Sequence, residues 1–140
     1  MPMSKLQSQN AESSHPFLKD KKHIYNKLID KNIVSVNAGY ATFEFELHSN
    51  LVHDETKVDG LTEFDTRKIK LETSLSNYDA RETIIHEIYH CMLEAAGLDE
   101  KNFDGHRMFL TNEQLVVCLS KQTMLIHRLN PGLMSLIYHG

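Results

Sequence analysis

The sequence predicts a single α+β domain: a small, mostly antiparallel sheet of three or four strands packed on one long helix, with a second helix near the C-terminus. Residues 33–47 and 57–75 carry the alternating, β-branched pattern of strands, whereas residues 80–96 and 111–130 carry the apolar spacing of helices. A chain of 140 residues is long enough for one hydrophobic core and short for two.

The composition is that of an ordinary globular protein, with 41% hydrophobic and 24% charged residues. A formal net charge of −4 argues against a protein whose main work is to neutralise nucleic-acid phosphates, so a nucleic-acid partner is not expected. The chain has no apolar run of the roughly 18 residues that a membrane span needs, and its first residues lack the apolar core of a signal peptide. We therefore expect a cytoplasmic protein without a membrane partner.

The first 20 residues differ from the rest in being rich in Ser, Gln, Asn and Lys, with almost no apolar periodicity. They predict a disordered leader, which places the single folded domain at residues 21–140. A short regular segment at residues 24–29 opens that domain.

The strands are predicted from two segments. Residues 33–47 favour one or two strands, because Phe43, Phe45 and Leu47 alternate with polar residues and share one face. After a polar loop, residues 57–75 are typical of a β-hairpin whose turn lies at Asp65 and Thr66.

The first long helix is predicted from Ala80 to Ala96. Asp79 and Glu82 resemble a capping box at its start, and Gly97 is a suitable residue just after its end.

The second long helix begins near Thr111 or Asn112 and stops at Asn130–Pro131, before a short terminal turn or helix. Cys91 and Cys118 lie within these two helical patterns without CxxC spacing, which predicts reduced thiols.

The first long helix contains the sequence HEIYH, in which His86 and His90 are four residues apart. Side chains at this spacing lie one turn apart on the same helix face, so both imidazoles can bind one Zn²⁺. Glu87 projects beside them and can accept a proton from a zinc-bound water. The pattern predicts a metal site with one zinc ion per chain.

Two histidines do not complete a zinc site, and three residues could supply a further protein ligand. Glu94 shares the helix face but lies eight residues, about 12 Å of helix rise, beyond His86, which suits a partner of an imidazole better than a ligand. Glu113 lies in the first turn of the next helix, and His106 lies in the loop between the two helices.

The HEIYH helix resembles that of the zincin metallopeptidases. The preceding stretch, GLTEFDTRKIKLETSLSNYDARETIIHEIYHCMLE, is similar to compact zincin-like proteins that are common in phages and related to the ImmA/IrrE-like group. This resemblance implies a zincin-like fold, with His86 and His90 as zinc ligands, Glu87 as the catalytic base and Glu113 as the third ligand. It also implies a zinc-dependent hydrolase of peptide or protein substrates, in the host cytoplasm if the protein is phage-encoded.

A second resemblance is to SprT-like proteases, which place a third histidine in a Gly-His segment like Gly105–His106. It implies cleavage of DNA-bound proteins and a basic groove near the motif, for which the candidates are Arg67, Lys68, Lys70 and Arg81. A third alternative is a regulatory zinc-binding protein that is not catalytic or that cleaves one recruited partner. For the oxyanion of the reaction, His106, Tyr78 and His127 remain open as stabilising groups.

Overall fold

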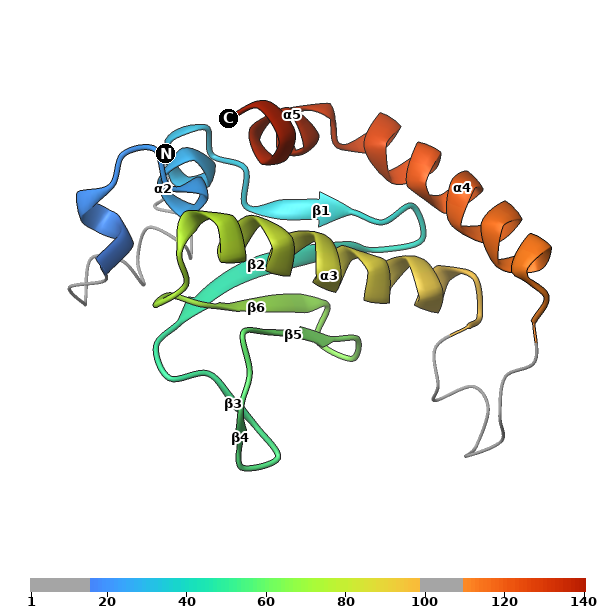
Figure 1. The fold of residues 1–140 in the computed structure, drawn as a ribbon, viewed down its shortest axis with the longest axis horizontal. Helices are drawn as coiled ribbons and strands as arrows, with labels where there is room; N and C mark the ends of the chain where they lie inside the picture. The colour runs from blue at the N-terminus through green and yellow to red at the C-terminus, as the bar shows by residue number, and fades with distance from the viewer. Residues whose placement is uncertain (1–15, 99–109) are drawn as a thin grey trace.

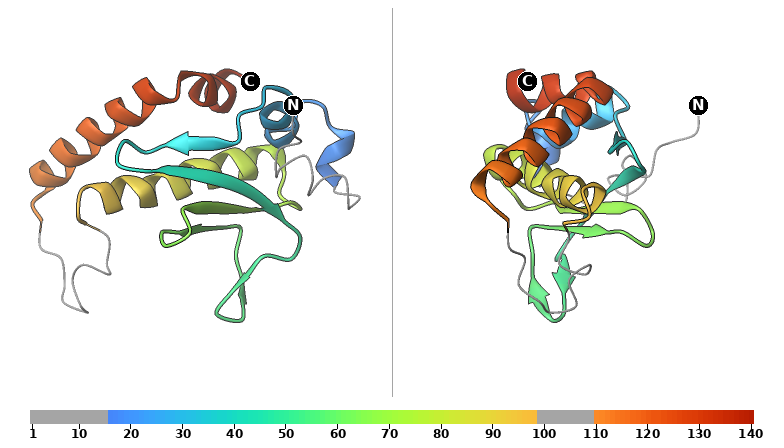
Figure 2. Two further views of the ribbon diagram at one scale, coloured as in Figure 1. Left: turned by 180° about the vertical axis from the view of Figure 1, so that it is seen from behind. Right: turned by 90° about the vertical axis from the view of Figure 1, so that its right-hand side faces the viewer.

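The structure, a computed structural model, describes residues 16–98 and 110–140. It confirms the α+β class: within these residues, a small, mostly antiparallel sheet packs against four α-helices. Helix α3 lies along one face of the sheet, and helices α2, α4 and α5 lie near α3 (Figure 1). Figure 2 shows the same layering from behind and from the side.

The main sheet has four strands in the order β1-β2-β6-β5. Their bounds are β1 Ser35–Asn37, β2 Thr42–His48, β5 Gly60–Glu63 and β6 Lys68–Glu72. The pair β5–β6 is the antiparallel hairpin that the sequence predicted. Strands β1 and β2 also pair antiparallel, whereas β2 and β6 run parallel. Strand β5 therefore lies at the edge of the sheet, and within the described part of the chain it pairs with β6 alone.

The predicted alternation in β2 is confirmed. Phe43, Phe45 and Leu47 are buried beneath α3, together with Ile69 and Leu71 of the neighbouring strand β6. This apolar face of the sheet forms one side of the hydrophobic core.

A second, smaller hairpin was not predicted. Strands β3 (Val52–His53) and β4 (Thr56–Lys57) pair across the region where the predicted polar loop gives way to the predicted hairpin segment. Strands of two residues with exposed side chains are too short to show an alternation of apolar and polar residues in the sequence. The hairpin projects away from the main sheet next to β5 (Figure 1).

Helix α3 (Asn77–Ala95) begins three residues before its predicted start. The capping residue is Ser76, whose side chain accepts a hydrogen bond from the backbone N–H of Asp79, so Asp79 and Glu82 do not form the predicted capping box. The predicted end is confirmed: Gly97 has a φ of +73°, a left-handed conformation that favours glycine.

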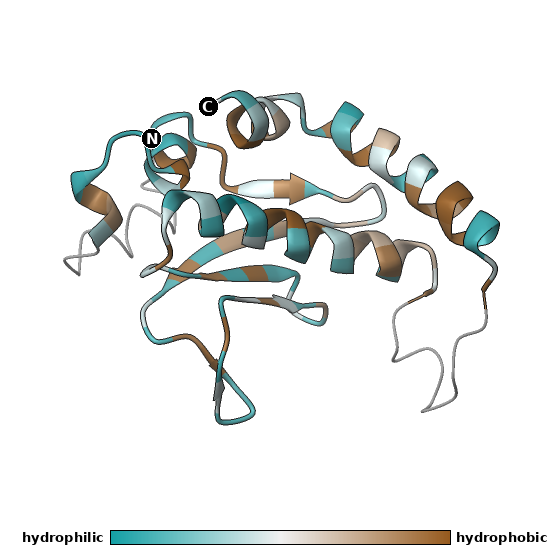
Figure 3. Cartoon of the chain, viewed as in Figure 1, coloured by the Kyte–Doolittle hydropathy of each residue, from teal (hydrophilic) through white to brown (hydrophobic). Residues whose placement is uncertain are grey.

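Helix α4 (Asn112–Leu129) has the predicted bounds and a complete capping box between Thr111 and Gln114. It buries only Ile126, and other apolar side chains on it are exposed, including Val116, Val117 and Met124. Its hydrophobic and hydrophilic residues alternate along the ribbon in Figure 3.

Helices α2 (Ile24–Asp30) and α5 (Pro131–His139) are short and well packed. Within α5, Leu133, Met134 and Ile137 are buried in the core that α2 shares.

None of the helices in the described ranges is both long and apolar enough to cross a membrane. Cys91 is buried, Cys118 is half-buried, and both are free thiols, in line with the sequence prediction.

The folded domain begins before residue 21. Pro16–Lys19, within the segment predicted to be a disordered leader, form a 3-10 helix whose Phe17 is 2% exposed and packs against the rings of His23 and Tyr25. One buried aromatic side chain has no periodicity, which is why sequence patterns missed it. Residues 1–15 lie outside the described part of the chain.

Candidate metal centre

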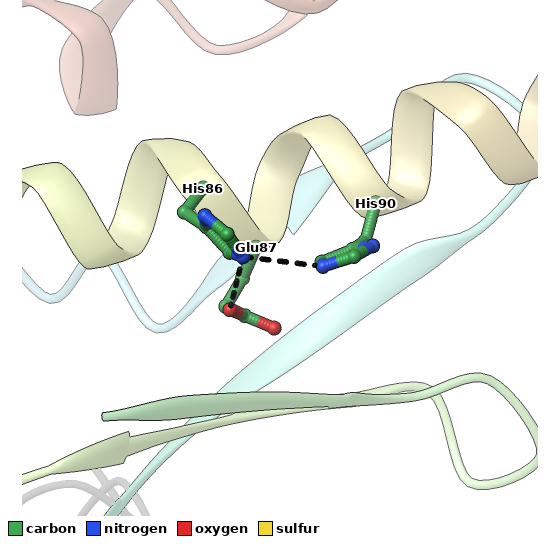
Figure 4. A group of neighbouring side chains, drawn as sticks. All are labelled: His86, Glu87 and His90. Atoms are coloured by element: carbon green, nitrogen blue, oxygen red, sulfur yellow. Dashed lines mark hydrogen bonds and ion pairs between the residues drawn. The ribbon is translucent and has the colours of Figure 1, made fainter. Parts of the chain in front are cut away.

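The HEIYH segment occupies the middle of α3, where the helix passes the edge of the sheet. Ile84, Ile88 and Cys91 face the core, and this fixes the rotation of the helix about its axis. His86, Glu87 and His90 consequently project together from the helix toward the side where β5 lies (Figure 4). They are the one group of three or more His, Cys, Asp or Glu side chains within residues 16–98 and 110–140 whose ligand atoms converge.

The two imidazoles have the separation that a zinc ion requires. Their Nε2 atoms are 3.3 Å apart. Two nitrogens bound to a tetrahedral zinc at about 2.0–2.1 Å each are themselves about 3.3 Å apart. The same distance suits a hydrogen bond between the rings when one Nε2 carries a proton. The side chain of His86 is 67% exposed, so the pair can be reached from solvent.

The carboxylate of Glu87 is held beside this pair and is only 4% exposed. Its Oε1 accepts a hydrogen bond of 3.0 Å from the Thr62 hydroxyl of strand β5. Its Oε2 lies 3.8 Å from Nε2 of His86. One carboxylate oxygen is thus fixed by the sheet, and the other faces the two imidazoles.

Gly60 allows β5 to approach α3 this closely. A Cβ atom at this position would lie 2.7 Å from Cγ2 of Thr83 and 3.0 Å from both Cγ and Oε2 of Glu87. A distance this short means that any other residue would displace the side chain of Thr83 or of Glu87, or the strand itself.

A cleft of about 400 Å³ opens beside the two elements. Its walls are residues 57–60, which lead into β5, and four residues of α3: Glu82, Thr83, His86 and Glu87. The cleft therefore gives access to His86 and to the carboxylate of Glu87.

The cleft reaches the start of β5 at Gly60, where the strand has a free edge within the described part of the chain. In the antiparallel pair with β6, the Glu72 N–H donates to the Asp59 carbonyl, so that residues 59, 61 and 63 bond toward β6. The backbone groups of Gly60 and Thr62 accordingly point toward the free edge. An extended chain could pair with them next to His86 and His90.

The structure does not bring Glu113 to the two histidines. Glu113 is exposed in the first turn of α4 and is not part of the converging group. Ile126 fixes which side of α4 faces the core, and Glu113 lies 13 residues before it, about 140° around the helix and about 20 Å along its axis. The sequence correctly predicted helix α4, but it did not determine which way α4 is rotated about its axis and therefore where Glu113 points.

The other predicted candidates also stand apart from the group. Glu94 is half-buried further along α3 and does not converge with His86. Tyr78 is 74% exposed at the start of α3. His127 packs against Tyr138 and lines a small cavity with Tyr89, apart from the cleft that His86 lines. His106 lies outside the described residues.

Cys91 directly follows His90 but is not available as a ligand. Its side chain is fully buried, and burial raises the pKa of the thiol to about 12, with the nearby carboxylate of Glu87 acting in the same direction. A metal binds the thiolate, which this environment disfavours.

The basic residues near the motif do not form a groove. On the outer face of the sheet, Lys68 pairs with Glu46 at 2.6 Å and Lys70 pairs with Glu63 at 3.1 Å. Arg81 donates to the backbone carbonyls of Ile137 and Gly140. Three of the four residues considered for a basic groove are thus engaged within the fold.

Sequence reasoning missed two residues of the site, Thr62 and Gly60. Both lie in the predicted hairpin, but no local pattern connects either one to Glu87, more than 20 residues later. Comparison with protein-family models, with curated proteins and with solved structures finds no match to this chain. The site is therefore interpreted from its own geometry.

Proposed function

We propose that this protein is a zinc-dependent metallopeptidase of a compact, zincin-like kind. The observation that carries the proposal is the separation of 3.3 Å between the two Nε2 atoms of His86 and His90, with the carboxylate of Glu87 fixed beside them. Imidazoles are ligands that zinc prefers, and of the predicted third ligands His106 lies outside the described residues. His86 and His90 would hold the ion, and Glu87 would remain the catalytic base.

A bound zinc would supply Lewis acidity, which polarises a peptide carbonyl and makes a nearby water easier to deprotonate. Glu87 would accept the proton at Oε2, the oxygen that faces the imidazoles, and would later deliver it to the leaving amine. Thr62 supports this role because its hydrogen bond to Oε1 leaves Oε2 as the reactive oxygen. The burial of Glu87 keeps bulk water from competing for the carboxylate.

A peptide is the substrate that best suits the surroundings. The backbone groups of Gly60 and Thr62 at the free edge of β5 can hydrogen-bond with an extended chain, which a small ester or sugar cannot imitate. Such a chain would place its carbonyl groups along the cleft next to Glu87.

Two substitutions in the same helix turn test the proposal. Glu87→Gln should keep about one zinc per chain but reduce the cleavage of an unstructured protein substrate by about a hundredfold or more, because the base is lost and the ligands remain. His90→Ala should lose both zinc and cleavage. His139→Ala, which changes an exposed histidine in the last turn of α5, is the matched control and should retain both. Zinc-loaded Glu87→Gln with full activity would overturn the mechanism.

A further inference from the structure

We infer that a second hollow, beside the far end of β5, binds a large apolar side chain of the substrate. The protein would then prefer extended peptides that carry a residue such as leucine or phenylalanine about one or two residues from the bond that is cleaved. This inference rests on the proposed function and adds the class of substrate to it. It follows from the place of the hollow along β5 and from the side chains that line it.

The second hollow has a volume of about 300 Å³ and lies at the free edge of β5. Its lining runs from Leu61 through the β5–β6 turn to Thr66, and His53 of β3 completes it. Among the described residues that line it, none belongs to β6, and the β3–β4 hairpin lies on the other side of β5 from β6 (Figures 1 and 2). The hollow therefore opens on the side of β5 where an extended chain could pair.

Strand β5 and helix α3 run side by side in the same direction. A Cβ atom at Gly60 would touch Thr83, and Thr62 contacts Glu87, which is four residues further along α3. Two residues of a strand and four residues of a helix both span about 6–7 Å, so the two elements stay in step. The two imidazoles, which lie on either side of Glu87 in the sequence, therefore pass β5 close to Thr62.

The cleft and the second hollow lie on opposite sides of this point. On the strand side, the cleft is lined by residues 57–60, which precede Thr62. The second hollow is lined by residues 61–66, and the middle of this segment lies about one or two residues beyond Thr62. A peptide paired with β5 would have its cleaved bond near Thr62, so the side chain that enters the second hollow belongs to a residue about one or two positions away.

The fold already engages two of the ionisable side chains that line the second hollow. The carboxylate of Glu63 pairs with Lys70 at 3.1 Å and accepts a hydrogen bond from the Thr66 hydroxyl. The imidazole of His53 lies 3.3 Å from the carboxylate of Asp54. A charged side chain of a substrate would have to compete with these existing contacts.

Apolar surface in the second hollow comes from Leu61 and Phe64, which are both half-buried. They reach it from opposite faces of the sheet, because Phe64 packs edge-on against Phe43 on the core side and Leu61 alternates to the outer side. Asp65 is exposed in the turn, where water solvates its carboxylate. The volume is at the lower end of the range for ligand pockets, which suits one large side chain.

The expected preference is moderate because the hollow is open to solvent on one side. Removing about half of the surface of a phenylalanine side chain from water should favour its peptide by about threefold to tenfold. This preference should change little with salt concentration, since it does not depend on charge.

The experiment measures binding and not turnover. Two fluorescent peptides of alanine and serine, identical except for a central phenylalanine or serine, are titrated with Glu87→Gln protein in the presence of zinc, and fluorescence anisotropy is recorded. The titration is repeated with Leu61→Asp added, which introduces a carboxylate directly across the strand pair from Lys70. The matched control is Val52→Asp, which changes an exposed apolar residue of β3 that does not line the hollow.

The phenylalanine peptide should bind about threefold to tenfold more tightly than the serine peptide. The preference should fall below about twofold with Leu61→Asp and persist with Val52→Asp. Equal binding of the two peptides, no binding of either, or a preference that survives Leu61→Asp would overturn the inference. The comparison of the two peptides decides even if Leu61→Asp fails to fold.

Cleavage by the wild type separates this inference from the proposed function. Mass spectrometry of the products should place the cut about one or two residues from the phenylalanine, and a cut elsewhere in the peptide would overturn the inference. A phenylalanine preference in binding without any zinc-dependent cleavage would sustain the inference about the hollow and overturn the proposed hydrolysis. Cleavage without a phenylalanine preference would do the reverse.

Discussion

Helices α3 and α4 are nearly equal in length, 19 and 18 residues, but the fold holds them very differently. Seven residues of α3 are buried, whereas in α4 only Ile126 is. The side chains expected to meet on α3 do meet, and Glu113, the one expected to reach them from α4, does not. A functional side chain is thus placed reliably only where buried neighbours fix both the axis and the rotation of its helix.

The cause lies in the partners of each helix. Helix α3 packs over the apolar residues of β2 and β6, and it also contacts β5 through Gly60 and Thr62. Helix α4 leaves Val116, Val117 and Met124 exposed, and its start is stabilised by its own capping box. Local signals are therefore sufficient to form α4, but they do not determine where its side chains point.

The largest expected difference in stability is between a core position of α3 and an exposed position of α4. Ile84 is 0% exposed, so Ile84→Ala should lower the free energy of unfolding by about 2–5 kcal/mol. Val116 is 59% exposed, and Val116→Ala should change it by no more than about 0.5 kcal/mol. Urea unfolding followed by circular dichroism measures both, and similar losses in the two variants would contradict the difference between the helices.

A smaller effect is expected at the contact between α3 and β5. Gly60→Ala introduces a Cβ atom 2.7 Å from Thr83 Cγ2, which should cost about 1–3 kcal/mol and also reduce cleavage because Glu87 is displaced. Gly132→Ala on α5 is the matched control, since its Cβ would lie 3.4 Å from the flexible end of Ile33. Unfolding and cleavage assays on both variants test this, and a Gly60→Ala protein as stable and active as wild type would show that the close approach is not required.

The smallest expected effect is the pH dependence that His23 confers at the N-terminal end of α3. Burial lowers the pKa of His23 below its ordinary value of 6.5, despite the hydrogen bond to the Leu75 carbonyl that raises it. Because the unfolded chain takes up the proton first, this histidine contributes stability above about pH 6.5 that is lost as the pH falls below it.

His23→Asn keeps a side-chain acceptor for the Tyr25 N–H that caps α2 but removes the titration. With metal removed by a chelator, the stability difference between wild type and this variant should shrink from pH 7.5 to pH 5.5. A difference that stays constant over this range would show that His23 does not titrate on unfolding.

The long helices, the alternation in β2 and the histidine pair of the site could be predicted because their signals are local. Helical spacing brings His86 and His90 together whatever the rest of the chain does, and the alternation around Phe43 and Phe45 defines the buried face of β2. The contact of Thr62 with Glu87 joins residues 25 apart in sequence, and the parallel pairing of β2 with β6 joins residues of similar separation. Such contacts depend on how the sheet and α3 pack, which no single segment encodes.

The most direct test of the metal centre is the zinc content of three proteins purified identically and offered zinc: wild type, His90→Ala and Glu113→Ala. We expect about one zinc per chain in the wild type and in Glu113→Ala, and none in His90→Ala, because we propose that both imidazoles of α3 bind the ion, and Glu113 does not converge with them. A wild type that binds no zinc, or a Glu113→Ala protein that loses it as His90→Ala does, would contradict this assignment.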